Sequence, residues 1–69
     1  MYTGKVGRVV HTRGFGFISA RDGRDIFFHE SSLIDINLSN LKSGEDVEFE
    51  VEKTEKGPRA FNIKVLSTQ

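Results

Sequence analysis

A strict alternation of apolar and charged residues at positions 46–52 constrains the fold of this chain more than any other feature. Val47, Phe49 and Val51 alternate there with three glutamates. Successive side chains of a β-strand point to opposite faces, so this pattern predicts a strand with one apolar and one charged face. The apolar face must be buried against something, and the rest of the chain has to supply the partner.

Four further segments have strand character, three through a similar alternation and residues 4–10 through their valine content. We predict strands at residues 4–10, 15–18, 25–29 and 59–65. In the last of these, the alternation directs Phe61, Ile63 and Val65 inward.

The segments between the predicted strands contain turn signals. Asp22-Gly23 is typical of a hairpin turn, and Lys56-Gly57-Pro58 predicts a turn before the last strand. Residues 30–44 are the least regular part of the chain. Their apolar residues fall at helical spacing, so we expect a long loop that contains one helical turn.

Five short strands within 69 residues favour a small barrel. An open antiparallel sheet of this size would expose one apolar face and two unpaired edges. The OB-fold is a five-stranded Greek-key barrel, and its usual ligands are oligonucleotides and oligosaccharides. We therefore expect one domain over residues 1–69, an all-β, five-stranded antiparallel OB-fold barrel.

The charges balance overall but are unevenly distributed. Residues 1–29 carry a net charge of 5 − 2 = +3, residues 30–52 carry 1 − 7 = −6, and residues 53–69 carry 4 − 1 = +3. Such segregation suits a positive face opposed by a negative face. A random scatter of solvated charges remains the alternative.

The two strands at 15–18 and 25–29 divide their side chains into two sets. One set is Gly16, Ile18, Ile26 and Phe28, and the other is Phe15, Phe17, Phe27 and His29. Each set lies on one side of the sheet, and one of them must line the interior. If the aliphatic set is inside, three phenylalanine rings and an imidazole lie together on the surface.

Flat exposed rings can each stack a nucleobase, and such stacking contributes about 1–3 kcal/mol per base with little sequence preference. The opposite assignment, with Phe15 and Phe17 in the core, stays open. Phe28, Phe49 and Phe61 weigh against it, because they already provide the aromatic volume that a small barrel needs.

Four basic residues border this predicted aromatic surface: Lys5, Arg8, Arg13 and Arg59. Phosphate groups need such partners, and each contact makes binding dependent on salt. Any single surface cation is more often merely solvated. A dinucleotide-binding reading of Gly14-x-Gly16 fails, because Ser19 occupies the third glycine position.

Two segments resemble a known family. The stretches RGFGFI at 13–18 and DIFFHES at 25–31 resemble the paired RNA-binding signatures of bacterial cold-shock proteins, and the similarity extends over residues 4–63. The resemblance implies a five-stranded barrel that binds single-stranded nucleic acid and acts as an RNA chaperone or antiterminator. It also implies that bases stack on Phe15, Phe17, Phe27 and His29, with Lys5, Arg13 and Arg59 nearby.

The chain departs from the family pattern at four positions. The family usually has tryptophan at Arg8, an aromatic residue at Val9, phenylalanine at Glu30 and often another at Leu38. These departures predict a weaker or differently selective binder. Arg8 can compensate in part, because a guanidinium group stacks on bases and pairs with phosphate.

The residues do not favour catalysis or metal binding. The chain has no cysteine and two histidines, His11 and His29, whereas zinc takes three or four protein ligands. Ser31 and Ser32 lie close to His29 in sequence, which is weak evidence for a nucleophile. We expect no enzymatic activity, no cofactor, no metal and no small-molecule substrate.

Single-stranded RNA or DNA is the expected partner. No apolar stretch approaches the roughly 20 residues that span a bilayer, so we expect no membrane contact and a soluble, cytoplasmic monomer. One alternative is a protein-interaction OB module with weak or lost nucleic-acid binding, which Glu30 and the zero net charge favour. Another is a translation-factor-like module on structured RNA.

Overall fold

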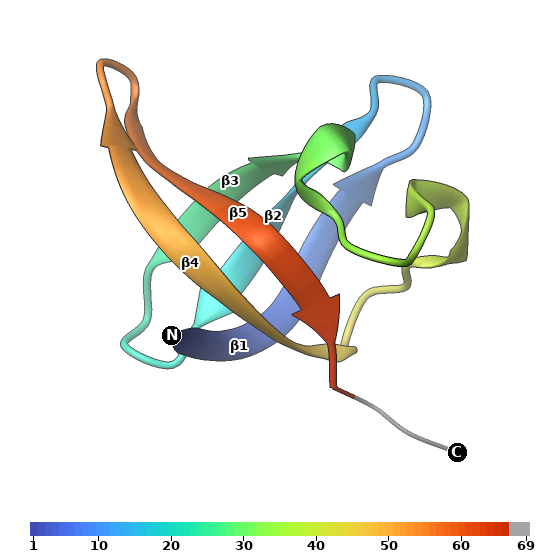
Figure 1. The fold of residues 1–69 in the computed structure, drawn as a ribbon, viewed down its shortest axis with the longest axis horizontal. Coiled ribbons are helices and arrows are strands. Elements are labelled where there is room, and N and C mark those ends of the chain that lie inside the picture. The colour runs from blue at the N-terminus through green and yellow to red at the C-terminus, as the bar shows by residue number, and fades with distance from the viewer. Residues whose placement is uncertain (67–69) are drawn as a thin grey trace.

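The computed structural model describes residues 1–66, in which five β-strands close into a barrel (Figure 1). The strands are β1 (Tyr2–Val10), β2 (Phe15–Ala20), β3 (Asp25–His29), β4 (Asp46–Thr54) and β5 (Gly57–Val65). Figure 1 shows the β4–β5 hairpin crossing over the sheet formed by β1, β2 and β3. The prediction of an all-β, five-stranded barrel is confirmed.

The strands follow one another around the barrel in the order β1-β2-β3-β5-β4, and β4 pairs with β1 to close it. Four of these pairings are antiparallel. β3 and β5 instead run parallel, with Phe27 opposite Arg59. A closed ring with an odd number of strands cannot alternate direction at every pair, so closure itself requires such a parallel pairing.

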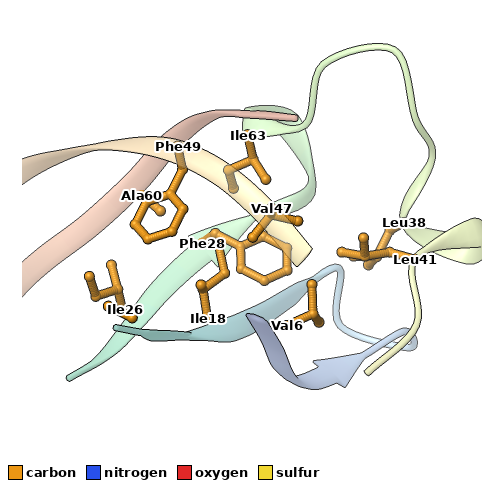
Figure 2. Packing of buried hydrophobic residues seen from close by; sticks show 11 residues of the cluster. Val6, Ile18, Ile26, Phe28, Leu38, Leu41, Val47, Phe49, Ala60 and Ile63 are labelled. Carbon is orange, nitrogen blue, oxygen red and sulfur yellow. The ribbon is translucent and has the colours of Figure 1, made fainter. Parts of the chain in front are cut away.

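The interior is filled by the side chains that alternate inward. Phe28 and Phe49, both 0% exposed, occupy the centre of the barrel, with Ile18 and Ile26 beside them (Figure 2). The aliphatic set of β2 and β3 is therefore the buried one. Gly16 lies in the same set, and a Cβ there would lie 2.5 Å from the Arg8 backbone carbonyl oxygen and 2.8 Å from the Phe28 ring, so the position has no room for a side chain.

Residues 30–44 form two short 3₁₀ helices rather than the single helical turn that the sequence predicts. These are η1 (Glu30–Ser32) and η2 (Leu38–Asn40). Leu38 and Leu41 are buried and pack at one end of the core (Figure 2). This loop thus covers an open end of the barrel.

The expected inward orientation of Phe61 is wrong. Ala60 and Ile63 are both 0% exposed, whereas Phe61 is half-buried and is not packed against the core cluster. The register of β4 and β5 shifts by one residue near Asn62, whose φ of 52° marks a bulge. An extra residue reverses the alternation on one side of it, so Phe61 faces outward.

Within residues 1–66, helices are too short to cross a membrane.

Candidate nucleic-acid interface

The outer face of β1, β2 and β3 presents its side chains in three cross-strand rows. The rows are Val10–Phe15–His29, Arg8–Phe17–Phe27 and Lys5–Ser19–Asp25. The parallel ladder extends the middle row to Arg59 on β5. We call Phe15, Phe17, Phe27 and His29 the aromatic patch. The structure thus brings together all four residues for which the sequence predicts base stacking.

The three phenylalanine rings contact one another. Their centroids lie 6.1 Å apart for Phe15 and Phe17, 5.6 Å for Phe15 and Phe27, and 5.9 Å for Phe17 and Phe27. Two of the three contacts are edge-to-face. Such pairs contribute about 0.5–1.5 kcal/mol each beyond area burial, so the rings hold one another in place. Because of this packing the rings are half-buried rather than fully exposed.

His29 ends β3 and also caps η1. Its Nδ1 accepts a hydrogen bond from the Ser31 backbone N–H at 3.2 Å and lies 3.0 Å from the Ser31 hydroxyl oxygen. With Nδ1 accepting, the neutral ring carries its proton on Nε2. The contact between His29 and Ser31 therefore orients the imidazole and starts a helical turn. This structural role accounts for the proximity of the two side chains, and no nucleophilic role of Ser31 is needed to explain it.

Two arginines extend the middle row on either side. Arg8 is exposed and lies opposite Phe17, while Arg59 lies opposite Phe27 and is half-buried. The Arg59 Nε is buried without a hydrogen-bond partner among the described residues, and the Glu52 carboxylate is 3.9 Å away. A bulge between Val6 and Arg8 sets this arrangement, because it restores Arg8 to the outward side.

Lys5 and Arg13 lie farther from the aromatic patch. Lys5 is in the third row, with Ser19 and Asp25, and its ammonium group pairs with the Asp46 carboxylate at 2.8 Å. Both side chains of this pair are more than half exposed, so the pair contributes little. Arg13 is exposed in the turn that precedes Phe15, and it makes no ion pair within residues 1–66.

The four departures from the family pattern do not all reach this surface. Val9 packs against the core and Leu38 is 5% exposed within it. Arg8 and Glu30 are the exposed departures. Glu30 lies against Gly14, where a Cβ would come within 2.6 Å of the carboxylate. This places a negative charge beside the turn that leads into the aromatic patch.

A cavity of about 420 Å³ adjoins the patch between β3 and the β4–β5 hairpin. Its lining includes Phe27, Lys56 and Arg59. Sequence reasoning treated Lys56 as a turn residue, since nothing in the local pattern indicates that this hairpin packs beside β3. A larger cavity of about 550 Å³ lies near Lys5 and Leu66, and no residue of the aromatic patch lines it.

The predicted acidic face is present on β4 but is not isolated. Glu52 lies near Arg59, and Glu48 is opposite Lys64 on β5. The Asn62 side-chain amide donates to the Glu50 carboxylate at 3.2 Å. β5 therefore supplies partners along this row, and the separation of charge is weaker in space than in sequence. The described residues contain no group of three or more acidic or histidine side chains placed to hold a metal ion.

Comparison with known proteins agrees with this geometry. Residues 2–66 match the family model described as the 'Cold-shock' DNA-binding domain. The chain is 42% identical over 55 residues to the major cold shock protein of Streptococcus pyogenes serotype M6, covering 80% of this chain and 82% of that protein. It is 40% identical over 63 residues to a cold shock-like protein of Thermotoga maritima, covering 91% and 96%. For the cold shock-like protein CspE of Bacillus anthracis the identity is 41% over 64 residues, covering 93% and 96%.

A solved structure of Drosophila Unr, CSD456, has a similar fold. It superposes with a TM-score of 0.80 at 26% sequence identity and covers 99% of this chain. The chain spans 27% of the length of that structure, so the similarity concerns one part of a longer protein.

Proposed function

The chain belongs to the cold-shock domain family, a non-enzymatic family whose membership implies nucleic-acid binding, and on that premise we propose that it binds single-stranded RNA or DNA by base stacking on the aromatic patch. In this proposal Phe15, Phe17, Phe27 and His29 each stack a base.

One observation carries the proposal: three phenylalanine rings remain partly exposed although the barrel does not need them inside. Phe28 and Phe49 fill the centre of the core. A contiguous apolar patch on a small protein is usually a binding surface. Each stacked base would contribute about 1–3 kcal/mol, and every base has a face that can stack.

Basic residues supply the contacts with phosphate. Arg8 and Arg59 flank the middle row, and Arg13 precedes Phe15. The Arg59 side chain is 40% exposed and lies beside Phe27, where its guanidinium group can reach a phosphate. Lys5 contributes less in this proposal, because it lies one row farther from the aromatic patch than Arg8.

The proposed affinity is lower than that of relatives with a full set of aromatic residues. Arg8 occupies a position where the family usually stacks a tryptophan, and Glu30 places a carboxylate near the path of the strand. Stacking with little sequence preference favours unpaired over paired strands, so we propose an RNA-chaperone or regulatory role in the cytoplasm. The same reasoning predicts that the protein opens weak RNA hairpins.

Fluorescence anisotropy with labelled oligo-dT and oligo-rU at two salt concentrations tests the proposal. We expect saturable binding that weakens with salt. In both Phe17→Ala and Phe27→Ala, the binding free energy should be less favourable by about 1–3 kcal/mol. Tyr2→Ala is the matched control, because Tyr2 is an exposed aromatic residue that stacks on Phe49 away from the patch.

A folded protein that binds neither strand would refute the proposal and favour a protein-interaction module. A preference for folded RNA over both oligonucleotides would favour the translation-factor-like alternative. An affinity for oligo-dT equal to that of ordinary cold-shock proteins would contradict the weaker binding.

A further inference from the structure

Phe61 is an outward-facing aromatic residue that the proposed site does not yet use. The residues on either side of the bulge, Ala60 and Ile63, are both fully buried, although an unbroken strand would place them on opposite faces. The pairing changes from Glu50 opposite Phe61 to Glu48 opposite Lys64, which adds one residue to β5. Bulges commonly redirect a side chain in this way.

The bulge is held by a specific contact. Asn62 has a φ of 52°, and its side-chain amide donates to the Glu50 carboxylate at 3.2 Å. Asparagine tolerates this left-handed conformation better than most residues. The outward direction of Phe61 is therefore set by the local backbone geometry of β5.

The parallel pairing of β3 and β5 places Phe61 next to the aromatic patch. Phe27 and Arg59 are paired, and the residues two positions farther along each strand are His29 and Phe61. Residues separated by two positions share a face, so His29 and Phe61 both point outward along the same junction. The Ile34 backbone N–H donates to the Ile63 carbonyl at 2.9 Å, which keeps the chain after β3 beside β5.

The surroundings of Phe61 leave its ring available to a ligand. It is half-buried, it is outside the core cluster, and it forms no ring pair with another aromatic residue in residues 1–66. Arg59 lies two residues away on the same face of β5, towards Phe27. Glu50 lies on the other side of Phe61, so a phosphate is favoured on the β3 side.

We propose that Phe61 is an additional base-stacking position that extends the aromatic patch from β3 onto β5, with Arg59 contacting the intervening phosphate. The ligand is a further base of the same single strand, and the inference therefore rests on the proposed function. Phe61 would restore part of the stacking surface that the chain lacks at Arg8 and Glu30.

Oligonucleotide length separates this role from that of the central rings. A strand of about four nucleotides occupies the patch, whereas one of about eight reaches β5, within the site sizes of 4–16 nucleotides known for OB folds. We expect Phe61→Ala to weaken binding of the longer oligo-dT by about five- to 150-fold and to leave the shorter one unchanged. Phe17→Ala should weaken both.

Two further measurements guard against a purely structural effect. Phe61→Leu keeps most of the apolar contact but loses the aromatic face, so it should also weaken binding of the longer strand while melting close to the wild type. In wild-type protein, the Phe61 ring resonances should shift on addition of the longer strand and not of the shorter one.

An unchanged affinity of Phe61→Leu for the longer strand, with Phe17→Ala impaired, would overturn the inference and leave the proposed function intact. Loss of a dimer in Phe61→Ala without a change in affinity would also overturn it, in favour of contact between copies of this chain. A wild-type protein that binds neither length would instead refute the proposed function.

Discussion

Phe27 and Phe28 are neighbours in sequence, yet the structure places them on opposite faces of β3. The Phe28 ring is 0% exposed at the centre of the core, whereas Phe27 is half-buried on the outer face. Replacing each by leucine gives two matched variants, because the residue type, the change in volume and the strand are the same in both. We expect Phe28→Leu to reduce stability and Phe27→Leu to reduce affinity.

The magnitudes follow from burial. Truncating a buried phenylalanine to alanine costs about 3–5 kcal/mol, and leucine retains part of that volume, so we expect a loss of about 1–2 kcal/mol for Phe28→Leu. In a domain of this size that lowers the melting temperature by about 4–15 °C. Phe27→Leu loses its edge and tilted contacts with Phe17 and Phe15, at 5.9 and 5.6 Å, but remains solvent-accessible. Only the contact with Phe17 is edge-to-face, and it lies at the surface, so the free energy of unfolding should fall by about 0.5 kcal/mol, the low end of the range for one such pair.

Affinity should follow the reverse order. Phe27→Leu removes an aromatic stacking surface and should weaken binding of oligo-dT at least about fivefold. Phe28→Leu should bind like the wild type at a temperature where it is folded. Thermal unfolding followed by circular dichroism, together with fluorescence anisotropy, measures both quantities. The reasoning would be refuted if Phe27→Leu lost as much stability as Phe28→Leu, or if the two variants lost equal affinity.

Three further changes test other parts of the structure. Gly16→Ala would place a methyl group 2.5 Å from the Arg8 backbone carbonyl oxygen and 2.8 Å from the Phe28 ring, and should lower the free energy of unfolding in urea by about 1–3 kcal/mol; an unchanged midpoint would show that the barrel has room there. Glu30→Gln removes an exposed carboxylate near the proposed path of the nucleic acid, so it should raise the affinity for oligo-dT measured by anisotropy, and this gain should be smaller at high salt. A lower affinity would contradict this expectation. A hydrogen bond from the Arg24 backbone N–H lowers the pKa of Asp22 in the folded protein below its ordinary 3.8. The ionised Asp22 therefore stabilises the folded state fully above pH 3.8, and this contribution is lost as the pH falls through the lower folded-state pKa. The melting temperatures of wild type and Asp22→Asn should therefore converge in acid, and a difference independent of pH would exclude the effect.

The sequence predicted which side chains of β2 and β3 share a face because both strands are free of bulges. Their register is continuous from Phe15 opposite His29 to Ser19 opposite Asp25, so alternation along the chain equals alternation in space. The identity of the buried set remained open until the structure placed Phe28 in the core. Gly16 agrees with this assignment, because its inward-facing position has no room for a side chain.

The same reasoning failed on β5 because a bulge interrupts it. The alternation from Ile63 back to Phe61 predicts the same face for both, but the extra residue at Asn62 breaks that relation. A bulge is a feature of a strand pair, and the sequence of one strand does not reveal it. β1 shows the same effect, because its register changes between Val6 and Arg8, so that Arg8 points outward and Val9 packs against the core.

The sequence by itself determined the strands, the Asp22-Gly23 turn and the membership of the two side-chain sets, because these depend on residues that are close along the chain. Tertiary structure alone decided which set is buried, that β3 and β5 run parallel, and that Arg59 and Phe61 lie beside the aromatic patch. These features arise when the barrel closes, because closure pairs Phe27 with Arg59 and Lys5 with Asp46, residues far apart in the sequence whose proximity no local periodicity encodes.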